Sequence, residues 1–207
     1  WSHLARADEP DCGLTEIQIG RFEEARSIVE AAGLDVQICH LAASAGALWH
    51  PAARYDMVRP GIALYGISPN PAHMTASQIG LRAAMTLSAE LIVDREVPGG
   101  TGVSYGHTAR TERPTRLGVV PLGYADGIDR KASNAAPLVI NGHRTTIVGR
   151  VCMDQFVSEL PPGTKAGDRA WLFGDAREGL ATAEDWAEAS ETIGYEVVTR
   201  LGARVPR

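Results

Sequence analysis

Residues 15–40 read TEIQIGRFEEARSIVEAAGLDVQICH, and the pattern in this stretch decides the fold class. Apolar residues recur at helical spacing through residues 15–32, and Gly33 follows as a helix stop. Residues 36–40, VQICH, then have the composition of a short buried strand. A long helix followed at once by a short apolar strand is the repeating pattern of α/β proteins.

The same rhythm continues toward residue 61. Residues 44–49 (SAGALW) predict a short helix of small residues, which Pro51 ends. Residues 56–59 (DMVR) predict a second short strand, broken by Pro60 and Gly61. Strand, helix and strand in this order predict βαβ units with a parallel sheet.

A second, β-rich region follows. Pro69, Asn70 and Pro71 form a linker, and we place a boundary at about residue 77, between an α/β region (1–76) and a β-rich region (77–207). Asn141-Gly142 is a strong hairpin signal. One helix is predicted over residues 183–194, capped by Thr182 with Asp185 three residues on. The predicted strand runs are residues 86–97, 117–122, 138–151, 152–160 and 169–173.

Composition excludes several classes of protein. The chain has 207 residues, 44% of them hydrophobic, and a formal net charge of -5. This acidic balance argues against a nucleic-acid-binding protein. No apolar run approaches the ~18 residues of a membrane span, and no signal-peptide pattern is present. The three cysteines form no CxxC pair, so we expect free thiols and a cytoplasmic location. The histidines show no ligand spacing, and we expect no metal site.

The first segment that could carry chemistry is residues 59–66, RPGIALYG. A glycine after a short strand lets backbone N–H groups approach an anion, and a nearby arginine donates to a planar acceptor. A strand-to-helix turn with a solvated arginine explains the same pattern equally well.

The second segment is residues 102–107, GVSYGH, where Tyr105 stands in a glycine-rich loop. A phenol with a lowered pKa exchanges protons with a substrate, although a turn tyrosine packed on the surface has the same pattern. Two further segments, residues 121–127 (PLGYADG) and 149–155 (GRVCMDQ), place polar residues at the ends of apolar strands, where loops often carry function.

Taken together, the segments resemble the alanine racemase family. The resemblance covers essentially the whole chain and implies the last part of a barrel that binds pyridoxal 5'-phosphate (residues 1–76), of the (β/α)8 type, followed by the family's mainly β C-terminal domain (residues 77–207). The matching stretches are SHLARADEP, HLAAS, MVRPGIALYG, VSYGHT, PLGYADG, GRVCMDQ and RVPR.

The resemblance also implies residue roles on the cofactor side. Arg59 corresponds to the arginine that faces the pyridine nitrogen of pyridoxal 5'-phosphate, where a permanent charge discourages protonation of the ring. Ser44, with the backbone of Gly61 and Ile62, corresponds to part of the phosphate cradle. His3 corresponds to the histidine that links the arginine to the catalytic tyrosine.

On the substrate side, Tyr105 is similar to the catalytic tyrosine that exchanges the α-proton of L-alanine, supplied in this family by the second subunit of a head-to-tail homodimer. Met153 resembles the residue whose backbone contacts the substrate carboxylate. Arginines in the entry corridor would attract that carboxylate. The residues that resemble lining of the site and its corridor are Tyr124, Arg130, Arg150, Asp154 and Asp8.

Some features depart from the family pattern. Ala43 replaces the asparagine that usually precedes the phosphate serine, and Ala203 stands where a tyrosine is frequent. The family's Schiff-base lysine corresponds to a position before Trp1. Only two lysines are present, Lys131 and Lys165, both in turn-like contexts, so we expect that this chain alone does not link covalently to the cofactor.

The implied activity is interconversion of L-alanine and D-alanine, which supplies D-alanine for peptidoglycan. Two alternatives stay open. One is racemisation of another amino acid, such as serine or lysine, or a broad specificity. The other is a non-catalytic dimerisation fragment that retains the β domain. The composition and the resemblance imply neither a nucleic-acid partner nor a membrane.

Overall fold

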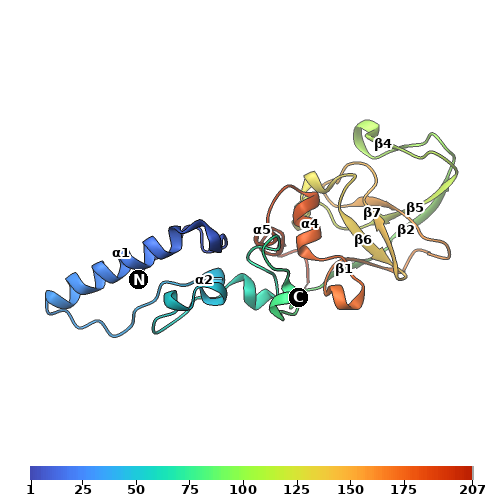
Figure 1. Ribbon diagram of the computed structural model, residues 1–207. Helices are drawn as coiled ribbons and strands as arrows, with labels where there is room; N and C mark the ends of the chain where they lie inside the picture. Colours follow the sequence, from blue (N-terminus) through green and yellow to red (C-terminus); the bar gives the residue numbers. More distant parts are fainter. Residues whose placement is uncertain (207) are drawn as a thin grey trace. The chain divides into compact units, whose positions relative to one another are not determined.

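The computed structural model describes residues 1–206. The chain divides into two compact units, Trp1–Arg82 and Ala83–Arg207, which we call unit 1 and unit 2 (Figure 1). The division falls slightly later in the chain than the boundary expected from the sequence.

Unit 1 is mainly helical. Its longest element is α1 (Leu14–Ala31), and α2 (Ser44–Trp49) is a short second helix; both were predicted. Gly33 has a φ of 73°, a left-handed conformation that suits glycine and ends α1. The remaining elements of unit 1 are η1 (Pro10–Cys12), η2 (Pro51–Ala53), η3 (Ile62–Tyr65) and α3 (Ala76–Ile79).

The core of unit 1 is small. Phe22 from α1 packs with Tyr55 at a ring-centroid distance of 5.0 Å, and both lie against a cluster of buried residues. That cluster joins the start of the chain to the region of α2. Its members are Leu4, Ala7, Leu41, Ala42, Ala45 and Ala53.

The two strands predicted in this region do not form. Residues 36–40 and 56–59 belong to no strand ladder, and Val36 and Ile38 are 47% and 57% exposed. A strand requires a neighbouring strand to satisfy its backbone N–H and C=O groups. Among the described residues, only a few backbone hydrogen bonds join the two segments, so the expected parallel sheet does not form.

The same segments nevertheless run side by side. Asp56 N donates to Cys39 O at 3.1 Å and Arg59 N to Ala42 O at 2.9 Å, and Ala43 and Arg59 form an isolated parallel bridge. Ser2 N also donates weakly to His40 O at 3.3 Å. These contacts bring the ends of three segments together.

Unit 2 is built from antiparallel sheets, in agreement with the predicted β-rich region. A four-stranded sheet has the order β1-β9-β6-β7, a three-stranded sheet has the order β2-β5-β8, and β3 pairs with β4. The strands are β1 (Leu87–Glu90), β2 (Val93–Val97), β3 (Gly102–Val103), β4 (Ala109–Arg110), β5 (Thr115–Val120), β6 (Pro137–Ile140), β7 (His143–Thr146), β8 (Phe156–Glu159) and β9 (Arg169–Phe173).

The long predicted runs are broken where the chain leaves a sheet. Residues 86–97 split into β1 and β2 because Leu91 N donates to Asp168 O while Ile92 N donates to Val119 O, so the chain moves from one sheet to the other. The predicted hairpin is confirmed, since β6 and β7 flank Asn141 and Gly142, whose φ angles are 49° and 78°. Two positive φ angles are typical of the tight turns that match strand twist.

Two helices complete unit 2. The predicted capping box is present at the start of α4 (Ala183–Ala189), where Asp185 N donates to Thr182 Oγ1 at 3.0 Å. The helix ends earlier than expected, and a separate helix, α5 (Gly194–Thr199), follows. The Trp186 indole donates to Leu172 O at 2.6 Å and fixes α4 to β9. Across residues 1–206, no helix has the length and apolar character needed to cross a membrane.

Candidate functional site

The first cluster of functional side chains surrounds Arg59 in unit 1. Arg59 Nη1 lies 2.6 Å from His40 Nδ1, and Arg59 Nη2 lies 3.2 Å from His3 Nδ1. Nη2 also donates to the backbone oxygens of Ser2 at 2.9 Å and Leu41 at 3.2 Å. These partners lie at the start of the chain and in residues 39–42, whose backbones are hydrogen-bonded to each other and to the segment that carries Arg59. These backbone hydrogen bonds therefore position the guanidinium.

The charge of Arg59 sets the direction of these hydrogen bonds. A guanidinium is always protonated and has no acceptor, so it donates to the Nδ1 atoms of His3 and His40. Burial, and then the charge of Arg59, lower the pKa of His40 below its usual 6.5. Trp1 stacks on His40 at 5.9 Å and lies 5.4 Å from Arg59 Cζ. Within residues 1–206, Arg59 Nε and the second N–H of Nη1 have no hydrogen-bond partner, so two donors stay available.

A second group of donors lies at Ser44, which is 3% exposed. Ser44 Oγ accepts from Gly61 N at 2.9 Å and from Ala63 N at 3.3 Å. A hydroxyl that accepts two N–H groups still has its own proton to donate. The Ile62 N–H has no partner in the part of the chain that the structure describes. This cradle of hydroxyl and amide donors suits an anion.

Asp8 also lies in unit 1. Its side chain is not part of the Arg59 cluster or of the Ser44 cradle, although its backbone oxygen accepts from Asn70 Nδ2 at 2.8 Å. Its predicted corridor role therefore stays a prediction.

In unit 2, two of the predicted loops are joined through their backbones. Tyr124 N donates to Cys152 O at 3.0 Å and Ala125 N to Met153 O at 2.9 Å. A Cβ on Gly123 would lie 2.3 Å from Met153 O, so only glycine permits this approach. Tyr124 and Met153 are 44% and 54% exposed and lie where these two loops meet.

Tyr105 lies on a third loop, in η4 (Tyr105–His107), and is 72% exposed. A Cβ on the next residue, Gly106, would lie 3.3 Å from Arg150 Cζ, so the loop rests against the Arg150 guanidinium. Ser104 Oγ donates to Arg150 O at 2.7 Å. Tyr105, Arg150, Tyr124 and Met153 therefore belong to one group of adjoining loops.

The other predicted corridor residues of unit 2 attach to the same loops. Arg204 Nη2 pairs with Asp154 Oδ1 at 2.8 Å, and Arg204 Nε pairs with the buried Asp126 at 3.2 Å. Arg130 lies in η6 (Arg130–Ala132). Its backbone oxygen accepts from Ser133 Oγ at 2.5 Å, and that hydroxyl accepts from Val151 N at 3.0 Å.

Sequence reasoning assigned no role to some residues that these clusters contain. His40 is one of these residues. It lies at the end of an expected strand, four residues before Ser44, and that position could have indicated a role. Ser104 was missed because its importance rests on a positive φ angle of 59° and on its long-range hydrogen bond to Arg150 O. No local pattern reports either property.

The two lysines lie outside both clusters. Lys131 Nζ pairs with Glu191 Oε2 at 2.8 Å, and this carboxylate raises the pKa of Lys131. Lys165 is exposed in the turn after β8. In residues 1–206, no group of three or more histidine, cysteine or acidic side chains is arranged to hold a metal ion.

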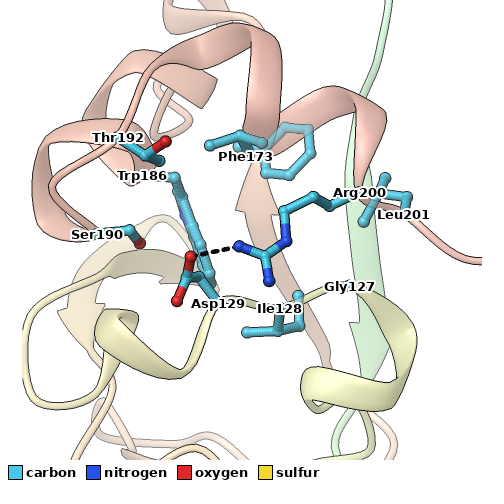
Figure 2. A pocket seen from close by; sticks show the side chains of 10 residues that line it. Gly127, Ile128, Asp129, Phe173, Trp186, Ser190, Thr192, Arg200 and Leu201 are labelled. Carbon is cyan, nitrogen blue, oxygen red and sulfur yellow. Dashed lines mark hydrogen bonds and ion pairs between the residues drawn. The ribbon is translucent and has the colours of Figure 1, made fainter.

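A small pocket of unit 2 lies beside η5 (Tyr124–Asp126) and is too small to be the substrate site. Figure 2 shows the ion pair between Arg200 and Asp129, at 2.6 Å, together with Phe173, Trp186 and Ile128. The cavity holds about 20 Å³, room for little more than one water molecule.

The units and their clusters define the class of protein. Unit 1 carries a fixed cation beside an anion cradle, and unit 2 is an antiparallel β domain that presents an exposed tyrosine, an arginine and loop backbone. These are features of a two-domain protein with a candidate anion site in one unit and candidate acid–base side chains in the other.

Comparisons with known proteins identify the family. The family model described as alanine racemase, C-terminal domain, matches residues 84–207, and that described as alanine racemase, N-terminal domain, matches residues 1–69. The chain belongs to the alanine racemase family.

Individual relatives agree. The alanine racemase of Thermobifida fusca is 53% identical over 208 residues, which is 100% of this chain and 55% of that protein. The solved alanine racemase of Streptomyces coelicolor superposes with a TM-score of 0.98 at 50% identity, covering 100% of this chain and 54% of that one. The structure from Bacillus anthracis, solved with bound L-Ala-P, gives a TM-score of 0.91 at 35% identity, covering 99% of this chain and 53% of that one. The chain thus spans about half the length of the relatives it matches.

Proposed function

We propose that this chain is the tyrosine-bearing part of an alanine racemase, which interconverts L-alanine and D-alanine with pyridoxal 5'-phosphate. The observation that carries the proposal is the Arg59 cluster beside the Ser44 cradle, because the two supply donors for a ring nitrogen and for a phosphate. The Bacillus anthracis relative, solved with bound L-Ala-P, supports an alanine-like ligand.

The donor set fits the cofactor. Ser44 Oγ has a proton to donate, and the Ile62 N–H has no partner among residues 1–206. Both would bind phosphate oxygens, while the Gly61 N–H orients the Ser44 hydroxyl. Arg59 Nε–H would donate to the pyridine nitrogen. When bound, pyridoxal 5'-phosphate stabilises the negative charge left on the substrate Cα after its proton leaves.

Arg59 sets the character of that site. A guanidinium has too high a pKa to give its proton to the ring nitrogen, so the ring stays uncharged at that atom. His3 and His40 hold the guanidinium by accepting from it, as their 3.2 Å and 2.6 Å contacts indicate. An uncharged ring nitrogen would withdraw fewer electrons from Cα, which favours return of the proton to Cα over side reactions.

The unit 2 loops supply the groups that act on the substrate. Tyr105 exchanges the α-proton on the face from which L-alanine reacts, and the backbone of Met153 binds the substrate carboxylate. Arg150 attracts that carboxylate, together with Arg130, and Tyr124 and Asp154 line the approach. We propose that the second subunit of a head-to-tail homodimer provides this set.

We propose that a lysine outside this chain, in the complete protein, serves the opposite face. In this proposal the complete protein works in the cytoplasm and supplies D-alanine for peptidoglycan. Unit 1 would be the last part of a (β/α)8 barrel, where segments 36–40 and 56–59 gain strand neighbours.

The test uses the complete enzyme that contains this sequence, loaded with cofactor. We expect Tyr105→Phe to lower kcat for L-alanine by roughly 10²–10⁴-fold, since it removes an acid–base group. Tyr195→Phe, which removes a hydroxyl in α5 away from both clusters, serves as the control. Faster turnover of L-serine or L-lysine than of L-alanine would show that the enzyme acts on that amino acid instead. Absence of turnover with every amino acid would favour the non-catalytic alternative.

A further inference from the structure

We propose that Ser104 and Asn134 are positioning residues that fix Tyr105 against residues 149–152. This inference rests on the proposed function, because it assigns the two residues to the proton exchange at Tyr105. Tyr105 is 72% exposed, so little packing of its own restrains the ring. Its position must come from the residues that bracket it.

The first restraint precedes Tyr105. Ser104 has φ 59° and ψ -173°, a region that residues other than glycine rarely adopt. Its hydroxyl donates to Arg150 O at 2.7 Å and lies 3.3 Å from Cys152 Sγ. The strained backbone persists because this side chain ties it to the neighbouring loop.

The second restraint follows Tyr105. Asn134, with φ 61°, accepts from Gly149 N through Oδ1 at 2.6 Å and donates to Thr108 Oγ1 through Nδ2 at 3.2 Å. One amide therefore connects the end of the tyrosine loop to the start of the Arg150 segment. An amide is suited to this because it donates and accepts at once.

The backbones at this point are in close contact. A Cβ on Gly149 would lie 2.8 Å from Val103 O and 2.9 Å from Ser104 Cβ. Gly149 also has a φ of 80°. Glycine is therefore required both by the lack of space for a Cβ and by the left-handed backbone conformation. The hydrogen bonds of Ser104 and Asn134 flank this contact on both sides of Tyr105.

The consequence is specific to one of the two proton transfers, the one at Tyr105. At Tyr105 the Cα–H bond of L-alanine breaks, the proton passes to the phenolate oxygen to form an O–H bond, and the electron pair stays with the substrate. A loosened Tyr105 slows this transfer, whereas proton removal from D-alanine by the opposite group is unaffected. A displacement of about 1 Å can cost roughly 10²-fold in rate.

The experiment compares Ser104→Gly and Asn134→Gly with wild type in the cofactor-loaded complete enzyme. Glycine keeps the positive φ available while removing the side chain, so the loop is not strained further. Ser88→Ala, a serine of β1 outside the loops, is the control. The measurements are kcat and KM, the primary deuterium isotope effects with α-deuterated L-alanine and D-alanine, the melting temperature, and hydrogen exchange of the peptide spanning residues 104–108.

We expect each glycine variant to lower kcat by about 10- to 100-fold with KM within about twofold. The isotope effect should rise with L-alanine and fall with D-alanine. Hydrogen exchange at residues 104–108 should increase, the melting temperature should stay close to wild type, and Ser88→Ala should change none of these.

Unchanged kcat and unchanged hydrogen exchange in both variants, with an active wild type, would overturn the inference and leave the proposed function standing. Equal changes in the two isotope effects would also overturn it, because a purely structural role would not affect one proton transfer more than the other. A wild-type holoenzyme that racemises no amino acid would overturn both proposals.

Discussion

Arg59 shows how one residue can be defined by its neighbours more than by its own type. In sequence it is an arginine before proline and glycine, a common turn arrangement. In the structure two imidazoles and two carbonyls accept from its Nη atoms, which leaves Nε and one N–H of Nη1 without a partner among residues 1–206. A lysine at this position could not replace it, because an ammonium lacks the planar fork that reaches several acceptors.

His40 provides a pH prediction at this scale. Burial and the charge of Arg59 lower its pKa from 6.5, so the folded state binds the proton less readily than the unfolded state. The stability that neutral His40 contributes is therefore complete above pH 6.5 and is lost as the pH falls from 6.5 through the lower folded pKa. An NMR titration of the His40 ring in the complete protein should give a pKa below 6.5.

Arg59→Met is the informative companion to this titration. It should raise the pKa of His40 only part of the way toward 6.5, because burial is the larger cause and the charge of Arg59 the smaller one. A His40 ring that titrates at or above 6.5 in wild type would contradict the assignment of a neutral acceptor.

At the scale of elements, the end of the chain holds two site loops together. Arg204 pairs with Asp126 beside η5 and with Asp154 after Met153, and Gly202 N donates to Asp126 O at 3.0 Å. Asp126 Oδ2 in turn accepts from Gly123 N at 2.8 Å. Arg204, the first residue of the RVPR stretch, therefore has a structural role beside these two loops.

We expect Arg204→Gln to raise KM for alanine several-fold with a smaller change in kcat. The reason is that the loops bearing Tyr124 and Met153 would hold the substrate carboxylate less well in the ground state and the transition state alike. The melting temperature should also fall, because Asp126 is buried and loses its charged partner. Steady-state kinetics and thermal unfolding of the complete enzyme measure both effects.

Two variants sharpen this experiment. Arg204→Lys keeps the charge but not the fork, and should lie between wild type and Arg204→Gln. Arg177→Gln removes an arginine whose pair, Asp175, is two residues away, and should leave KM unchanged. An Arg204→Gln enzyme with wild-type KM would show that the loops hold their positions without this clamp.

At the scale of the whole molecule, the proposed function gives this chain one of the two acid–base groups. Tyr105 is present, whereas Lys131 is paired with Glu191, which keeps it protonated, and Lys165 is exposed in a turn. A protonated or fully solvated ammonium is a poor nucleophile toward an aldehyde. We therefore expect neither lysine to serve as the anchor for pyridoxal 5'-phosphate.

The prediction is tested on the 207-residue chain itself. After incubation with pyridoxal 5'-phosphate and reduction with borohydride, mass spectrometry should find no stoichiometric adduct at Lys131 or Lys165. The complete enzyme, treated identically, should carry one adduct on a lysine upstream of Trp1. A stoichiometric adduct at either lysine of this chain would refute the division of the active site described above.

Sequence by itself determined the local structure wherever the cause is local. The periodicity of residues 15–32 identified α1, Asn141 and Gly142 identified the β6–β7 turn, and Thr182 with Asp185 identified the start of α4. In each case the interacting atoms lie within a few residues of one another. The motif stretches likewise indicated the family without any knowledge of contacts.

The tertiary structure decided what depends on partners far along the chain. Residues 36–40 read as a strand but form none, because a strand exists only with a neighbour that satisfies its backbone. Residues 86–97 read as one strand but divide between two sheets. The contacts of Arg59 with His40 and of Ser104 with Arg150 join residues 19 and 46 positions apart, and only the folded backbone sets those distances.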